Sequence, residues 1–285
     1  DQTLFALVPN EGLYKSVDGG AVWQPTGLNG SLSALAVSPD FANDSLLIVI
    51  TAAGDTKISN DGGATWNALA GPTLTASSDY SIAFSPTFAA DQAVMVASAA
   101  DPGPYRSING GASWESAGWY DPSMNFRDGL LGGGVQALAF APNQGWDGVA
   151  FAATRAGLAR SAYGGGSWMQ MNDGLPQLAV RAFALAPGDP QVMLAGTGYF
   201  EQLRFDSGVI VDDVGNIQLS TDGGVNWRQA SGRLARVNGV VFSPNFASDQ
   251  TAFAIAGMIG QHGFVEGGIY RSTDGGQNWT AVQPT

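Results

Sequence analysis

The stretch Ser220-Thr-Asp-Gly-Gly-Val-Asn-Trp227 recurs along the chain in six similar copies. Each copy begins with serine and ends with tryptophan, and five of the six carry Asp or Asn at the third position. The others are Ser16-Val-Asp-Gly-Gly-Ala-Val-Trp23, Ser59-Asn-Asp-Gly-Gly-Ala-Thr-Trp66, Ser107-Ile-Asn-Gly-Gly-Ala-Ser-Trp114, Ser161-Ala-Tyr-Gly-Gly-Gly-Ser-Trp168 and Ser272-Thr-Asp-Gly-Gly-Gln-Asn-Trp279. Successive serines lie 43 to 59 residues apart, which is typical of one four-stranded blade plus its loops. The chain is therefore predicted to be an array of six equivalent β-units.

A second phrase precedes every copy from the second onward, an apolar run closed by proline. The copies are Ala36-Val-Ser-Pro39, Ala83-Phe-Ser-Pro86, Ala139-Phe-Ala-Pro142, Ala184-Leu-Ala-Pro187 and Val241-Phe-Ser-Pro244. Proline ends such a strand because it has no N–H for the ladder. A continuous apolar run follows, as in Leu46-Leu-Ile-Val-Ile50, and predicts a strand buried on both faces. The unit is thus strand A, strand B, strand C, the turn quoted above and strand D, with no helical period.

Composition limits the function. The 285 residues carry 12 basic and 24 acidic side chains, a net charge of −12, which argues against nucleic acid or an anionic membrane as partner. No apolar run approaches the roughly 18 residues of a membrane-spanning helix, and no membrane insertion is expected. The absence of cysteine and the presence of one histidine leave too few ligands for zinc. No cofactor is expected.

The repeated turn has a structural explanation. Asp or Asn at its third position can accept hydrogen bonds from the amides of the turn, the glycines supply positive φ, and the tryptophan can be buried between neighbouring sheets. The residues given this structural role are Asp18, Asp61, Asn109, Asp222, Asp274, Trp23, Trp66, Trp114, Trp168, Trp227 and Trp279. Tyr163 breaks the pattern in the fourth copy, and that hairpin is expected to be the least regular.

The phrase Ser-x-Asp-Gly-Gly-x-x-Trp resembles the Asp-box (BNR) repeat of sialidases, xyloglucanase-type glycoside hydrolases, sortilin-type receptors and photosystem II assembly factors. The resemblance extends over nearly the whole chain. It implies an all-β fold, a six-bladed β-propeller of four-stranded antiparallel blades in which the Asp-box is a structural hairpin remote from any active site. We expect a single domain, residues 1–285, with blades at approximately 1–30, 31–72, 79–118, 134–172, 178–231 and 236–285.

The first blade is predicted to lack its own strand A. Asp1-Gln-Thr-Leu-Phe-Ala-Leu7 aligns with Asp249-Gln-Thr-Ala-Phe-Ala-Ile255, which is the start of a strand B. Three interpretations remain open: a three-stranded blade, a piece of a longer repeat array, or a strand donated by a partner. We favour the second. An unfilled inner edge would expose ladder groups and apolar surface.

Candidate binding residues lie in the three longest insertions, at 116–134, 198–215 and 257–267, all on the face opposite the Asp-boxes. Long loops on a rigid scaffold commonly carry function. The candidates are Trp119, Tyr120, Asp121, Arg127 and Asp128 in the first, Tyr199, Glu201, Arg204, Asp212 and Asp213 in the second, and His262 and Glu266 in the third. Aromatic rings beside carboxylates and arginines suit a sugar or a peptide. Equally, these loops could pack on each other and plug the channel.

Sharper chemistries are less well supported. Asp206, Asp212, Asp213 and Asn216 are oxygen ligands that suit calcium, without a complete EF-hand spacing. A Ser-His-Asp triad would have to use His262 and finds no Gly-x-Ser-x-Gly elbow. Glycoside hydrolysis needs two facing carboxylates, and Asp121 with Asp213 or Asp128 with Glu266 could provide them. The segment expected early in a sialidase is absent.

These observations favour a non-enzymatic recognition or assembly scaffold, secreted or on a cell surface (extracellular or periplasmic), that binds a protein or glycan through the insertion-bearing face. The first alternative is a carbohydrate hydrolase that uses a carboxylate pair. The second is a purely structural repeat segment of a larger surface protein.

Overall fold

The computed structural model describes residues 2–118, 134–141, 148–162, 164–175, 179–205, 208–257 and 267–282, with the backbone alone for 199–205 and 208–213. Within these ranges nearly all regular structure is β. Five sheets have four antiparallel strands, paired in the order A-B-C-D, and two sheets have three strands, one of which is the first blade in the order B-C-D. The all-β propeller prediction is confirmed, and six blade-type sheets are consistent with the predicted number.

The strands follow the repeat. Blade one contains β1 (Leu4–Val8), β2 (Gly12–Ser16) and β3 (Gln24–Asn29), and blade two contains β4 (Leu32–Val37), β5 (Leu47–Thr51), β6 (Thr56–Ser59) and β7 (Asn67–Ala68). Blade three contains β8 (Tyr80–Phe84), β9 (Val94–Ser98), β10 (Tyr105–Ser107) and β11 (Glu115–Ser116), and blade four contains β12 (Val135–Phe140), β13 (Ala150–Thr154), β14 (Gly157–Ser161) and β15 (Met169–Gln170). Blade five contains β16 (Val180–Ala186), β17 (Asp189–Thr197), β20 (Ile217–Ser220) and β21 (Arg228–Gln229), and blade six contains β23 (Val237–Phe242), β24 (Ala252–Ala256), β25 (Gly268–Ser272) and β26 (Thr280–Ala281). A further small sheet contains β18 (Tyr199–Phe205), β19 (Gly208–Gly215) and β22 (Leu234–Ala235).

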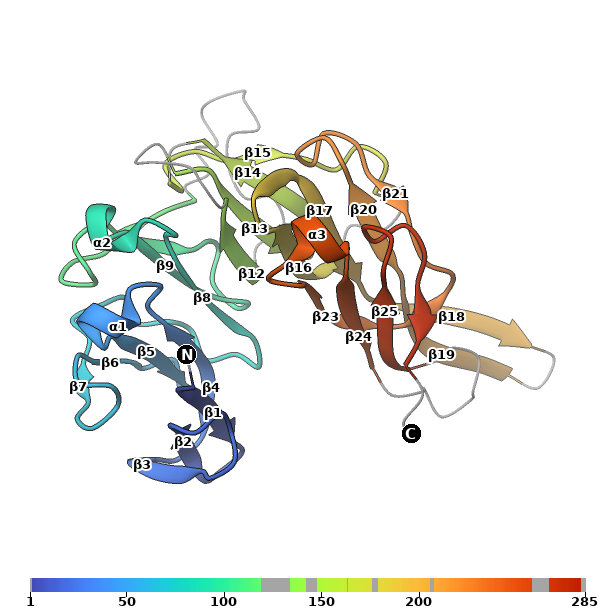
Figure 1. Ribbon diagram of the computed structural model, residues 1–285. Helices are drawn as coiled ribbons and strands as arrows, with labels where there is room; N and C mark the ends of the chain where they lie inside the picture. The colour runs from blue at the N-terminus through green and yellow to red at the C-terminus, as the bar shows by residue number, and fades with distance from the viewer. Residues whose placement is uncertain are drawn as a thin grey trace.

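The blades follow one another around an open arc, with blade one and blade six at its two ends (Figure 1). The A strands β4, β8, β12, β16 and β23 lie along its inner side, each against the next. In blade one the innermost strand is β1, a strand B, as the alignment predicted.

The hydrophobic core lies between neighbouring blades. Ile48 and Ile50 of β5, fully buried, pack against β9 and its surroundings in blade three. Similar clusters join the other pairs of neighbouring blades. Burial of each such side chain contributes about 1.5–3 kcal/mol, so each blade is held chiefly by its neighbours. Strands β9 and β13 are buried on both faces, as the apolar runs predicted.

Three one-turn helices correct the expectation of no helix. They are α1 (Phe41–Asp44), α2 (Phe88–Asp91) and α3 (Phe246–Asp249), and each connects strand A to strand B. A serine and an aspartate six residues later close the turn: Ser85 Oγ donates to Asp91 Oδ2 at 2.5 Å, and Asp91 Oδ1 accepts the N–H of Ala93 at 2.9 Å. Ser38 with Asp44 and Ser243 with Asp249 repeat this contact. We call it the Ser–Asp latch.

Candidate functional site

The Asp-boxes occupy one face of the arc together with the A–B connections. In every blade the first box glycine donates its N–H to a carbonyl just before or within strand B, at 2.7–3.0 Å. The six pairs are Gly19 with Gln2, Gly62 with Ser45, Gly110 with Gln92, Gly164 with Gly148, Gly223 with Gln191 and Gly275 with Gln250. The B–C turns and D–A connections therefore lie on the opposite face, which we call the insertion face.

Each box carboxylate is used by its own turn. In blade two, Ser59 Oγ donates to Asp61 Oδ1 at 2.7 Å, and Thr65 donates to the same carboxylate through its N–H and its hydroxyl. The Thr65 hydroxyl bond, with help from its amide and from Ser59, lowers the pKa of Asp61 to about 2. The backbone N–H of Asn278, which donates to the Asp274 carboxylate, is the main cause that lowers the pKa of Asp274 to about 2. These groups stay ionised and engaged, so they are unsuited to proton transfer near neutral pH.

The box tryptophans differ in burial. Trp168 and Trp227 are almost fully buried between blades, whereas Trp23 is 39% exposed. Trp66, Trp114 and Trp279 donate Nε1–H to the carbonyl of the second box glycine at 3.0–3.1 Å. Tyr163 lies outside the described residues, but its box keeps the bond from the Gly165 N–H to Ser161 Oγ at 2.8 Å.

Many of the predicted binding residues lie outside the described residues. These are Trp119, Tyr120, Asp121, Arg127, Asp128, His262 and Glu266, together with Asp206 of the calcium hypothesis. The two carboxylate pairs proposed for hydrolysis, Asp121 with Asp213 and Asp128 with Glu266, each include at least one of these residues, so they stay predictions. Within the described ranges, no three His, Cys, Asp or Glu residues gather where they could hold a metal ion.

The second insertion is a β-hairpin rather than the loop that the sequence suggested. Strands β18 and β19 pair over their full length, which places Glu201 opposite Asp212 and Phe200 opposite Asp213. Tyr199 pairs with Val214 and Arg204 with Val209. The five predicted residues of this insertion are thus held in one register. The hairpin projects from blade five, away from the inner side of the arc (Figure 1).

A buried polar network fixes the base of this hairpin. Thr197 Oγ1 donates to Asn216 Oδ1 at 3.0 Å and accepts the N–H of Asn216 at 3.1 Å, while Gln218 Nε2 also donates to Asn216 Oδ1. Thr197 and Gln218 are fully buried. Since two donors already use Asn216 Oδ1, this residue does not suit the calcium set proposed from the sequence. Pairing of β19 with β22 holds the hairpin from its other side.

Polar residues on the inner strands lie beside the hairpin base, and sequence inspection missed them. In four inner strands the pairing skips the second residue, which is Ser33, Gln136, Arg181 or Asn238. Such bulges redirect a side chain and are common beside functional sites. Arg181 contacts the Gly198 carbonyl at 3.4 Å and Gln136 Oε1 at 3.5 Å. The sequence does carry a signal for this position. Six residues before the proline that closes strand A, four of the five inner strands have a polar residue, and it is a different one in each: Ser33, Gln136, Arg181 and Asn238.

Arg236 completes this cluster. Its Nε donates to Asn238 Oδ1 at 2.9 Å. A Cβ on Gly198 would lie 2.2 Å from Arg236 Cγ and 3.0 Å from Arg181 Cδ, so only glycine allows both arginine stems to pack over the start of the hairpin. We call Gln136, Arg181, Arg236 and Asn238 the mouth cluster. It places guanidinium and amide donors where the hairpin meets the inner strands.

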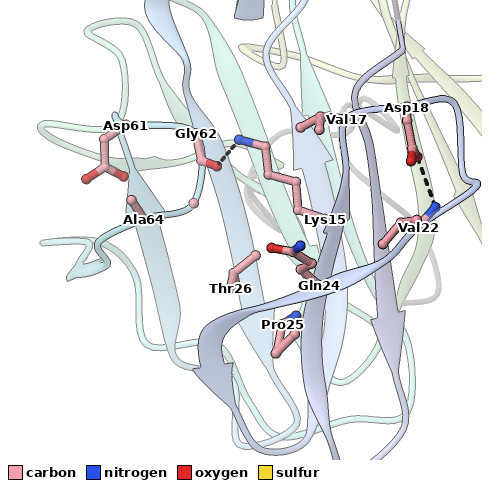
Figure 2. A pocket seen from close by; sticks show the side chains of 11 residues that line it. Lys15, Val17, Asp18, Val22, Gln24, Pro25, Thr26, Asp61, Gly62 and Ala64 are labelled. Atoms are coloured by element: carbon pink, nitrogen blue, oxygen red, sulfur yellow. Dashed lines mark hydrogen bonds between the residues drawn. The ribbon is translucent and has the colours of Figure 1, made fainter.

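Two hollows accompany these features. One, of about 520 Å³, lies on the inner side of the arc and is lined by apolar side chains of four A strands, among them Ile82, Phe84 and Phe140. The other, of about 310 Å³, is a crevice between the boxes of blades one and two. Figure 2 shows Lys15 spanning this crevice, where its Nζ donates to the Gly62 carbonyl at 3.0 Å. Arg106 makes the same contact to Gly164 at 3.2 Å, so the crevice belongs to the junction between blades.

A family model for the BNR/Asp-box repeat matches residues 270–281. This chain is a β-propeller protein with Asp-box repeats. An ancestral GH74 enzyme superposes with a TM-score of 0.67 at 23% identity, over 95% of this chain and 34% of the enzyme. YCF48 bound to D1 peptide gives 0.50 at 17% identity, over 85% and 67% of the two chains. The GH74 xyloglucanase from Xanthomonas campestris gives 0.51 at 14% identity, over 100% and 57%.

These similarities establish a shared fold. The propeller spans about a third of the length of the ancestral GH74 enzyme. No curated protein matches its sequence. None of the described helices is long and apolar enough to cross a membrane.

Proposed function

We propose that this propeller is a non-enzymatic recognition or assembly scaffold that binds a protein or a glycan through its insertion face. The observation that carries the proposal is the anchored hairpin β18–β19. A blade needs only a short turn between strands B and C, as blade four shows with Arg155 and Ala156 between β13 and β14. Blade five instead inserts a hairpin that leaves the blade and adds nothing to its four-stranded order.

The base of the hairpin supports a positioning role. Buried hydrogen bonds join Thr197, Asn216 and Gln218 at the point where the hairpin leaves β17, and only Gln218 Oε1 in this network has no partner among the described residues. This rigid base, with β22 on its other side, holds a projecting element in one orientation. Preorganisation of this kind lowers the entropic cost of binding.

The mouth cluster supplies the recognition chemistry. Arginine forks and amide groups donate to carboxylate, carbonyl and hydroxyl oxygens, which extended peptides and sugars both offer. The similar propeller YCF48 is described as bound to D1 peptide, which supports the protein alternative. We place the protein outside the cytoplasm, in an extracellular, periplasmic or cell-surface setting, on the basis of its Asp-box repeats and acidic, cysteine-free composition.

Deletion of residues 199–214 tests the proposal. Thr197 N–H donates to the Asn216 carbonyl at 3.0 Å, so the deletion leaves Gly198 and Gly215 as a two-residue turn like that of blade four, and Gly-Gly suits such turns. Binding to immobilised glycans and a peptide library is compared for the wild type and the deletion variant, and release of reducing sugar from the same glycans is measured.

We expect the wild type to retain a ligand without cleaving it. We expect the deletion variant to unfold in one cooperative transition, at a lower urea concentration because it lacks the fully buried Val214, and to lose the ligand. Turnover of a polysaccharide would replace the proposal with the hydrolase alternative. Retention of every ligand by the deletion variant would show that the hairpin does not carry the binding and would overturn its role, whereas the absence of any ligand for the wild type would favour a structural segment.

A further inference from the structure

The dipeptide Asn-Gly has a chemistry of its own, because the backbone nitrogen of the glycine can attack the side-chain amide of the asparagine. Glycine has no side chain to shield its nitrogen, and its backbone is permissive enough to bring that nitrogen onto the asparagine Cγ. The chain contains three such pairs, Asn29-Gly30, Asn109-Gly110 and Asn238-Gly239. All three asparagines are exposed to solvent, so their hydrogen bonds, and not their exposure, distinguish them.

Asn109-Gly110 is held at both reacting groups. Asn109 occupies the aspartate position of the third Asp-box, where its Oδ1 accepts the N–H of Ser113 at 2.9 Å and its Nδ2 donates to Ser113 Oγ at 2.8 Å. The attacking nitrogen would be that of Gly110, and its N–H donates to the Gln92 carbonyl at 3.0 Å. Attack on Cγ would have to break these hydrogen bonds, so the turn protects this asparagine.

Asn238-Gly239 is held by its strand. The Oδ1 of Asn238 accepts the Nε–H of Arg236 at 2.9 Å. Gly239 lies inside β23 and pairs with Ile255 of β24. Ring closure at this pair would therefore require local opening of the ladder between the two strands, which is rare in a core strand.

Neither reacting group of Asn29-Gly30 is held in this way. Asn29 is the last residue of β3, and only Gly30 and Ser31 connect it to β4. In the part of the chain that the structure describes, no hydrogen bond engages the Asn29 carboxamide or the Gly30 N–H. Gly30 has a φ of +109°, and no atom lies within 4 Å of the position that a Cβ would take. The connection therefore leaves room for the nitrogen to reach the side chain.

We propose that Asn29 is a site of spontaneous deamidation, which adds one negative charge to the connection between blades one and two. The Gly30 nitrogen forms a bond to Asn29 Cγ, and the side-chain nitrogen leaves as ammonia with the proton of the Gly30 N–H. The resulting succinimide is opened by water. Attack of water on the side-chain carbonyl gives aspartate, and attack on the main-chain carbonyl gives isoaspartate, in which the chain runs through the former side chain.

The isoaspartate product lengthens a short connection. It adds one methylene to the backbone where only two residues separate β3 from β4. Ser31 is anchored there, since its carbonyl accepts the N–H of Ala52 at 2.9 Å and its Oγ donates to Asn10 Oδ1 at 3.2 Å. We expect the longer backbone to loosen the contact with Ala52, which lies in the B–C turn of blade two. This site is apart from the hairpin and the mouth cluster, so it does not depend on the proposed function.

The full chain provides its own matched controls. It is incubated in mildly alkaline buffer made with water that is labelled with heavy oxygen, and peptide mapping by mass spectrometry follows the three Asn-Gly pairs together. The pairs share the reacting residues and differ in the hydrogen bonds that hold them. A second incubation in guanidinium chloride removes the fold, and there we expect similar rates at all three.

In the folded protein we expect Asn29 to deamidate at least ten-fold faster than Asn109 and Asn238. Both aspartate and isoaspartate should form, each with one heavy oxygen atom, and the Ala52 amide should exchange faster in the isoaspartate form. An intact Asn29, or equal rates at Asn29 and Asn109 in the folded protein, would overturn the proposal. So would aspartate as the sole product, or a difference between the pairs that persists in guanidinium chloride.

Discussion

Two isoleucines at the same position in different blades provide a direct test of the open arc. Ile50 of β5 and Ile255 of β24 each lie three residues after the residue that pairs with the box serine. Ile50 is fully buried against blade three, whereas Ile255 at the free face of blade six is 54% exposed. Substitution of each by alanine removes the same atoms from the same strand position, so burial is the variable that differs.

The magnitudes follow from the exposed fractions. Truncation of a fully buried Ile by three carbons loses about 2.4 kcal/mol of transfer free energy, at about 0.8 kcal/mol per methylene. The cavity left behind raises the cost to about 3–4 kcal/mol, within the usual range for such truncations. At Ile255 roughly half of this surface is already in water and no closed cavity forms, so we expect a loss of about 1 kcal/mol.

Urea unfolding followed by tryptophan fluorescence measures both variants, with the slopes checked against the wild type. The pair Leu158→Ala and Ile269→Ala repeats the comparison on strand C, where the exposed fractions are 0% and 49%. If Ile255→Ala lowered the unfolding free energy as much as Ile50→Ala, blade six would be covered in solution and the open arc would be wrong.

Three further predictions concern polar contacts. Ser85→Ala should lower the unfolding free energy by about 1–3 kcal/mol because it leaves a buried carboxylate short of a donor, and Ser243→Ala, at an exposed copy of the same latch, should cost less than about 1 kcal/mol; equal costs in urea unfolding would contradict this. The folded pKa of Asp61 is about 2, below the ordinary value of about 3.9, so its contribution to stability is present above pH 4 and is lost as the pH falls towards 2. Asp61→Asn keeps the acceptor, as Asn109 does naturally, and the stability gap between this variant and the wild type should close over that range; a gap independent of pH would refute the assignment. Thr197→Val should cost about 1–3 kcal/mol and speed amide exchange of the hairpin, whereas Thr197→Ser, which keeps the hydroxyl, should leave exchange near the wild-type rate; identical exchange in both would show that the network does not anchor the hairpin.

The fold was predictable because the residue types of the Asp-box determine the conformation of its turn. The glycines at 62 and 63 have φ of +68° and +91°. The box aspartate Asp61 accepts the N–H of Thr65, four residues later in the same turn. Six in-phase copies then fix the repeat. The one-turn helices escaped prediction because a four-residue segment such as Phe88–Asp91 is too short to show a helical period. Their signal was the paired Ser and Asp six residues apart.

The site was less predictable, for two physical reasons. The hairpin in blade five carries a readable signal, two runs rich in β-branched and aromatic residues around Asp206-Ser-Gly208, which was interpreted as a loop because the blade pattern already supplied its four strands. The mouth cluster has no local signal of its own. Arg181 and Arg236 are 55 residues apart in the sequence, and they meet only because Gly198 lets both stems approach the same backbone.

The two faces of the arc differ in how freely they can vary, and this difference is the reason to look for function opposite the boxes. On the box face, each first glycine donates to the carbonyl beside strand B in all six blades, so a change in length there breaks a bond that every blade uses. On the insertion face, blade four connects strands B and C with two residues and blade five with a hairpin, yet both blades keep the same register between B and C at the box serine. The fold therefore tolerates new elements on the insertion face at little cost to the blades: the buried hydroxyl that serves the two-residue turn of blade four at Thr154 serves the base of the hairpin at Thr197.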